Sequence, residues 1–289
     1  MTVAMGFAGQ HRRPRGGGAS VPPRPAQRLR RWALGGVLMG LALAVLLWAP
    51  AGWLASGVAS ATGGRVLLAD ARGTIWRGDA LLVLTGGAGS RDAVWLPERL
   101  AWRLSPTWLG AALTLSQPGA MPGEVTLRWL PGWRETRLQV QTTAPDGTLA
   151  VWPAAVLEGL GAPLNTLRPQ GQLLLQAHDL ALTRSQGPWQ LSGRAVFRVL
   201  DAASLVAVVS PLGSYEATLQ GTPGAAPTLA LRTLGGALLL NGQGQITPRG
   251  LRFTAQASAA PGQEAALANL LNIIGRRQGA VSLISIGSP

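Results

Sequence analysis

In residues 123–130, GEVTLRWL, polar and apolar side chains alternate from Glu124 to Trp129. Every second residue from Val125 to Trp129 is apolar, and the residues between them are polar. Successive side chains of a strand point to opposite faces, so this spacing collects the apolar residues on one face. The pattern predicts a strand with one covered and one solvated face, which is typical of antiparallel sheets.

The same period of two recurs along the chain beyond residue 62. It appears in RLQVQT (137–142), LSGRAVFRV (191–199), YEATLQ (215–220) and LRFTAQASA (251–259). The 39 glycines and 21 prolines fall largely between such segments, which favours hairpins and meanders over crossover helices. We therefore predict an all-β domain over residues 63–289, with antiparallel sheets that are open, curved or sandwich-like. Whether it forms two halves, about 63–150 and 151–289, is left open.

Few helices are expected in this domain. PGQEAALANLLNIIGRR (261–277) carries an apolar stripe from Leu267 to Ile274, and Gly275 is a typical residue for the helix end. Two shorter helices are predicted, in WPAAVLEGLGAP (152–163) and DAASLVAVVSP (201–211).

The segment RLRRWALGGVLMGLALAVLLWAP (28–50) is the most apolar part of the chain. The 17 residues from Trp32 to Trp48 carry no charge. With its flanks, a helix of this length at about 1.5 Å per residue spans roughly 30 Å of hydrocarbon. We therefore predict one N-terminal transmembrane helix over residues 32–50, followed by a linker over 51–62.

Arg30 and Arg31 precede this predicted helix, and Trp32 and Trp48 lie where interfacial aromatic residues belong. The positive-inside rule then makes residues 1–31, rich in Gly, Pro and Arg, a disordered basic cytoplasmic tail. A cleaved signal peptide is the competing interpretation, because ASA at 59–61 resembles a cleavage site. The long leader and the long apolar stretch favour an uncleaved anchor.

Composition excludes several classes of protein. The net charge of +13 is concentrated in the N-terminal tail, and the other arginines are scattered singly, unlike the clustered charge of a nucleic-acid-binding protein. Charged residues make up only 13% of the chain. The absence of cysteine rules out disulfides and thiolate metal sites.

No motif points to catalysis or to a cofactor. His178 and Asp179 are adjacent on a predicted strand and so point to opposite faces, which does not suit a catalytic triad. No metal-ligand spacing or phosphate-binding loop is present. Trp76, in ARGTIWRGDALLVLT (71–85), raises the question of a stacking site for sugars, lipids or peptides. We interpret it, with Trp102 and Trp129, as packing against the sheet. We therefore expect no enzyme activity, no cofactor and no metal.

The order of several segments resembles the type II secretion system protein N family. The segments are ARGTIWRGDALL (71–82), LAWRLSPTWL (100–109), VWPAAVLEGLGAPLNTLRPQGQLLL (151–175), GPWQLSGRAVFRV (187–199), SPLGSYEATLQG (210–221) and LGGALLLNGQGQI (234–246). The resemblance covers nearly the whole chain after residue 30, and the family has no catalytic residues to carry over.

The resemblance implies an accessory inner-membrane subunit of a Gram-negative cell, with its N-terminus in the cytoplasm and a β-rich domain in the periplasm. Such a subunit serves export of folded proteins across the outer membrane. It would dock with other secretion subunits, namely the secretin, the inner-membrane platform or the pseudopilus. A more distant likeness to AsmA-type envelope proteins implies the alternative, a lipid-handling module with an apolar β-groove. An envelope hydrolase is the third and poorest hypothesis.

Overall fold

The computed structural model describes residues 26–90, 92–161 and 164–287. The chain divides into two compact units between Leu46 and Leu47, and each is described by itself. The described part of the first unit is helix α1 (Ala26–Leu47), whose large apolar side chains are exposed. Residues 1–25 of the basic tail predicted over 1–31 lie outside the described residues.

The structure corrects the predicted transmembrane helix over residues 32–50. Within the described residues, no helix has both the length and the apolar character that crossing a membrane requires. Helix α1 begins before the arginines, at Ala26, so the basic residues lie within the helix, and it ends at Leu47. Pro50 follows shortly after, and proline disfavours a helical residue before it. Helix α2 (Ala51–Ala61) then occupies most of the range that we expected to be a linker.

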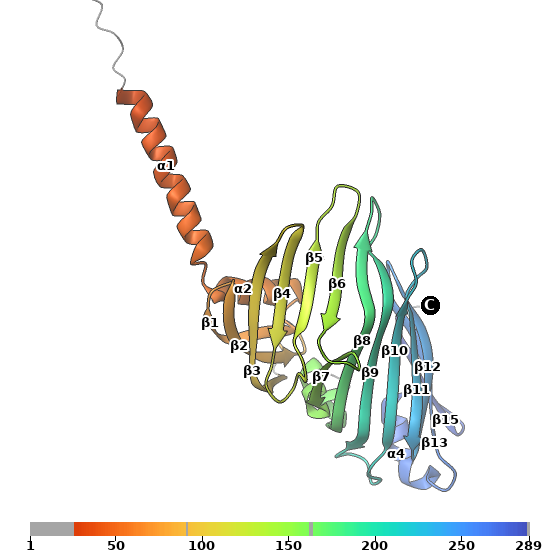
Figure 1. The fold of residues 1–289 in the computed structure, drawn as a ribbon. Helices are drawn as coiled ribbons and strands as arrows, with labels where there is room; N and C mark the ends of the chain where they lie inside the picture. The colour runs from red at the N-terminus through yellow and green to blue at the C-terminus, as the bar shows by residue number, and fades with distance from the viewer. Residues whose placement is uncertain (1–25, 91, 162–163, 288–289) are drawn as a thin grey trace, which may run out of the picture. The chain divides into compact units, whose positions relative to one another are not determined.

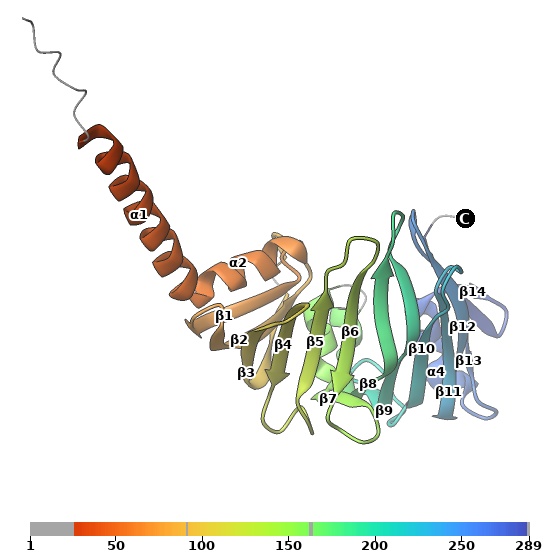
Figure 2. The same ribbon diagram turned by 45° about the horizontal axis from the view of Figure 1, so that its top comes forward.

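The second unit is built on a single antiparallel sheet of 15 strands (Figures 1 and 2). Its strands are β1 (Val66–Gly73), β2 (Arg77–Thr85), β3 (Ala93–Thr107), β4 (Gly110–Ser116), β5 (Val125–Leu130), β6 (Thr136–Thr142), β7 (Thr148–Pro153), β8 (Pro169–Arg184), β9 (Gln190–Ser204), β10 (Gly213–Gly221), β11 (Thr228–Gly236), β12 (Leu238–Thr247), β13 (Gly250–Ala259), β14 (Arg276–Gln278) and β15 (Val281–Ile286). The short helices are η1 (Ala154–Leu160), α3 (Leu164–Leu167) and α4 (Glu264–Ile274).

Neighbouring strands follow the chain order almost throughout. The hydrogen-bonded path runs from β1 to β13 and then through β15 to β14, with β7 paired to β8 beside it. Strands from both ranges 63–150 and 151–289 therefore belong to one sheet. Its two ends, β1 and β14, do not pair with each other in the described part of the chain. The prediction of a mostly antiparallel, open sheet with few short helices is confirmed.

The two faces of the sheet differ in character, as the alternation predicts. On β10, Tyr215 and Glu216 are adjacent and mark the two faces. The face of Tyr215, here called the apolar face, is covered in part by helices. Helix α2 packs on it beside Trp102, η1 packs beside Leu173, and α4 packs beside Tyr215. The face of Glu216, here called the polar face, carries most of the charged side chains of the strands.

Four acidic residues interrupt the strand ladders. Asp70, Glu98, Asp179 and Asp201 have positive φ angles of 47°, 65°, 50° and 49°. Each lies where the pairing register shifts, which is the signature of a β-bulge. Asp is one of the few non-glycine residues that visit this conformation readily. Because a bulge bends its strand, these positions curve the sheet.

The strands and helix α4 predicted from periodicity are confirmed, and the helix over 201–211 is wrong. In its place β9 continues to Ser204, because Ala203 and Ser204 pair with Gln170 and Pro169 of β8. Long-range pairing here overrides local helix preference.

The three tryptophans interpreted as packing residues differ in how far they are buried. Trp102 is only 3% exposed, so that prediction is confirmed. Trp129 lies on the apolar face but is 49% exposed, so its burial is wrong. Trp76 is half-buried in the turn between β1 and β2.

Candidate functional site

Glu216 is a buried acidic residue on the polar face, and its carboxylate lies between two arginines. Arg198 on β9 and Arg232 on β11 each lie 2.6 Å from its carboxylate oxygens. Arg198 also donates to the side-chain oxygen of Gln176 at 3.2 Å. Gln176 in turn donates to the backbone carbonyl of Asp146 at 3.3 Å. The contacts form one polar row from the turn before β7 across β8, β9, β10 and β11, which locks the register of these four strands.

Glu216 gives a prediction about acid stability. Burial disfavours its charged form, but hydrogen bonds from Arg198 and Arg232 outweigh burial and hold its pKa below the ordinary value of 4.5. Because the folded pKa lies below the unfolded one, the stabilisation is present at neutral pH and is lost as pH falls from the ordinary value through the lowered one. We expect Glu216→Gln to reduce unfolding free energy at pH 7 by about 1–2 kcal/mol, discounted for the exposure of the arginines. Urea titrations should show this difference shrinking below pH 4.5.

The matched control for this prediction is Glu124→Gln, at an exposed position where β5 begins. It should leave the unfolding free energy and its pH dependence unchanged. A Glu216→Gln deficit that persists undiminished under acid conditions would contradict the ion-pair explanation.

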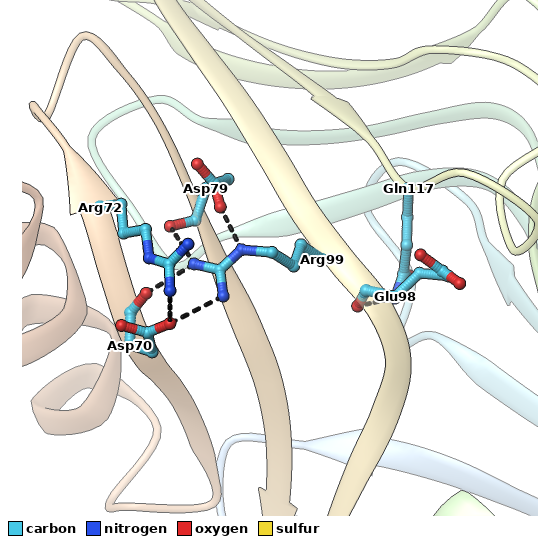
Figure 3. Close-up of polar contacts among 6 residues, drawn as sticks. All are labelled: Asp70, Arg72, Asp79, Glu98, Arg99 and Gln117. Carbon is cyan, nitrogen blue, oxygen red and sulfur yellow. Dashed lines mark hydrogen bonds and ion pairs between the residues drawn. The ribbon is translucent and has the colours of Figure 1, made fainter.

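A second group of ion pairs fixes the first three strands (Figure 3). Arg99 on β3 pairs with Asp79 on β2 and, at 2.9 Å, with Asp70 on β1. Arg72 reaches the same Asp70 oxygen at 2.7 Å. Hydrogen bonds from Arg99 and Arg72 lower the pKa of Asp70, while the hydrogen bond to Asp79 raises the pKa of Arg99. The charged groups of these four residues are paired with one another, and the pairs stabilise the bulge at Asp70.

Two arginines beside this group have no such partners. Arg77 on β2 lies directly opposite Arg103 on β3. Neither has an ion pair within the described part of the chain. They line a hollow of about 530 Å³ together with Thr114 and Ser116 and with the acidic residues Asp79 and Glu124.

The apolar face is left uncovered between the helices. Trp129 on β5 and Phe197 on β9 are 49% and 39% exposed on it. Partly exposed leucines and valines fill the strands between them, including Leu138 and Leu182, which pair across β6 and β8. This strip is apolar surface available for contact.

The sheet also has a free edge at its C-terminal end. Strand β14 pairs with β15 only at Val281 to Leu283, whereas β13 pairs with β15 as far as Ile286. The outer side of Ile284 to Ile286 thus has no strand partner in the described part of the chain. Such an edge can accept an added strand.

Three of the residues proposed from sequence as anchor flanks have described side chains, and all three are exposed. Arg30 is exposed on α1, and Trp32 on α1 and Trp48 after it are 81% and 75% exposed. The side chain of Arg31 lies outside the described residues.

His178 does not meet a catalytic partner. It lies on β8 opposite Arg194, and its ring lies against the turn glycine Gly147. Asp179 occupies the neighbouring bulge. Within the described residues, no group of three His, Cys, Asp or Glu side chains could hold a metal.

The polar row and the ion-pair group were missed by sequence reasoning. Alternation indicated which residues are polar, but pairing Glu216 with Arg198 and Arg232 requires the strand register. The exposed turn tryptophans were also missed, although a signal existed: Trp108, Trp133 and Trp189 each lie within three residues of a proline.

Comparison with known proteins gives a consistent result. The family model for type II secretion system (T2SS), protein N, matches residues 64–283. A protein of Klebsiella pneumoniae described as type II secretion system protein N is 30% identical over 213 residues, covering 71% of this chain and 75% of that protein. No solved structure gives a significant match. Because the match spans the sheet from β1 to β15, the chain belongs to the type II secretion system protein N family.

Proposed function

We propose that this protein is a non-enzymatic docking subunit of the type II secretion machinery, acting in the periplasm at the inner membrane. The observation that carries the proposal is the family match, which covers residues 64–283 and thus nearly the whole sheet. Membership of the family supports a role in the machinery, and the sheet offers contact surfaces for such a role.

Attachment to the inner membrane would come from helix α1. Its side chains from Trp32 to Leu47 are almost all apolar and exposed, which is unfavourable in water. Contact with lipid would remove this surface from water.

Docking would use the free edge of the sheet. An incoming strand beside Ile284 to Ile286 would gain backbone hydrogen bonds, and the alternate isoleucines would select its side chains. The expected partners are the secretin, the inner-membrane platform or the pseudopilus.

Site-specific photo-crosslinking in cells tests this docking role. A crosslinking residue at Ile286, which is 50% exposed on the free edge, should capture one of these named secretion subunits. The same residue at Val208, which is 89% exposed in the β9–β10 connection, is the control and should capture none. Absence of secretion subunits from the Ile286 products, together with normal export in a deletion strain, would refute the proposal.

A lipid-handling module is the second candidate, and the uncovered strip around Trp129 and Phe197 favours it. It predicts that lipid extracted from the purified chain decreases on Phe197→Arg. Unchanged lipid content in this variant would dismiss it.

A further inference from the structure

Four exposed tryptophans lie at one end of the sheet. Strands β1, β3, β5 and β8 run parallel to one another, because each is separated from the next by one antiparallel strand. The turns that follow them therefore lie at the same end (Figure 1). Three of these turns carry an exposed tryptophan, at 108, 133 and 189. The fourth carries Trp76, which is half-buried, and lies beside the exposed Trp48. We call this set (Trp48, Trp108, Trp133 and Trp189) the tryptophan rim.

Trp48 joins the rim through backbone contacts within the second unit. Pro50 forms a bridge with Thr74, and Ile75 donates a hydrogen bond to the carbonyl of Ala49 at 3.0 Å. These contacts fix residues 49–50 against the turn between β1 and β2. The chain thus leaves the sheet at the rim on its way to α1.

The rim tryptophans are exposed to a degree that is unusual for such a large apolar side chain. Trp108 is 99% exposed, Trp133 is fully exposed, and Trp48 is 75% exposed. Trp189 is half-exposed, and the guanidinium of Arg184 lies 6.0 Å from its ring centre. The connections at the opposite end of the sheet (86–92, 117–124, 205–212 and 234–237) contain no tryptophan.

The charge of the rim is basic. Arg134 follows Trp133, and Arg249 lies in the β12–β13 turn at the same end. The acidic residue beside them, Glu135, is paired with Arg137 at 2.7 Å. The rim therefore offers indole rings together with uncompensated guanidinium groups.

The arrangement of the rim distinguishes a bilayer from a protein partner. Its turns are about two strands apart, or roughly 10 Å, and form a row. Binding hot spots of proteins cluster centrally in packed pockets, whereas a row of protruding indoles matches an extended surface. Tryptophan favours the lipid headgroup region, where its ring is half-buried and its N–H remains hydrated. Arginine there binds phosphate.

We propose that the tryptophan rim inserts into the headgroup layer of a bilayer that contains anionic lipid. The sheet then contacts the membrane with the end that carries the tryptophan rim, and its opposite end is directed away from the membrane. This inference rests on the membrane attachment proposed above, because α1 ends at Leu47, directly before Trp48 of the rim. It adds that the sheet itself contacts lipid and is thereby oriented.

The chain offers a matched test, because it contains no cysteine. Leu109 lies beside Trp108 on the rim and is 67% exposed, whereas Leu205 lies at the opposite end and is 61% exposed. The full chain with Leu109→Cys or Leu205→Cys is labelled with a polarity-sensitive fluorophore. It is then reconstituted into vesicles of phosphatidylethanolamine and phosphatidylglycerol. The Leu109 label should shift to shorter wavelength and be quenched by nitroxide-labelled lipid, and the Leu205 label should do neither.

Replacing both Trp108 and Trp133 by serine in the Leu109→Cys chain should abolish this quenching while the chain still floats with the vesicles. A chain that does not float overturns the attachment itself and this inference with it. A floating chain whose Leu109 label remains in water overturns the rim contact alone. The rim contact with lipid is likewise overturned if the label is protected only in native membranes containing secretion subunits, since the rim would then bind protein.

Discussion

Replacing Trp102 by alanine should lower the free energy of unfolding by about 3–5 kcal/mol, as large truncations in cores do. Trp102 is 3% exposed and forms one buried cluster with Ala51 of α2 and Ala80 of β2. Its ring lies so close over Gly78 that a Cβ atom there would be 2.6 Å from it. Its indole nitrogen also donates to the carbonyl of Thr74 at 3.2 Å. Urea unfolding followed by far-ultraviolet circular dichroism measures the loss.

Trp133→Ala is the matched control, because it removes the same side chain from a fully exposed turn. It should change the unfolding free energy by less than about 0.5 kcal/mol, as surface substitutions do. Equal losses in the two variants would show that Trp102 is not a core residue of the folded chain.

Much of the fold could be predicted because one face of the sheet is covered. Alternation such as that from Val125 to Trp129 identifies strands and the face on which each side chain lies. It does not reveal how completely a face is covered, and for this reason Trp102 is buried while Trp129 is not. Coverage depends on where α2, η1 and α4 pack, which is a long-range property.

The other features that the sequence did not predict correctly also depend on long-range contacts. The apolar run at 201–211 has local helix preference, but pairing of its first residues with β8 extends the strand. The bulges at Asp70 and Glu98 set the register of the first strands, and nothing in their immediate sequence distinguishes them from ordinary strand acids. The ion pairs of Glu216 likewise depend on the register between β9, β10 and β11, which the local sequence does not reveal.

Replacing Gln117 by leucine should lower the free energy of unfolding by about 2–4 kcal/mol. The substitution leaves buried polar groups without hydrogen-bond partners, and each such group costs about 1–3 kcal/mol of stability. Gln117, which directly follows β4, is 1% exposed. Its amide nitrogen donates to the carbonyl of Pro97 at 2.7 Å. It also donates to the carbonyl of Glu98 at 3.2 Å, at the β3 bulge (Figure 3). Its oxygen accepts a hydrogen bond from the indole nitrogen of Trp152 at 3.0 Å. The side chain thus joins β3 and β7, which do not pair in the sheet.

A double-mutant cycle with Trp152→Phe separates this role from simple packing, because phenylalanine removes the donor that Gln117→Leu leaves without an acceptor. The double variant should be more stable than the sum of the single losses predicts, by about 1 kcal/mol, since both partners of the bond are then apolar. The carbonyls of Pro97 and Glu98 stay unpaired in both leucine variants, so they cancel from the comparison. Strict additivity would mean that the indole finds another acceptor, and that Gln117 acts through the bulge alone.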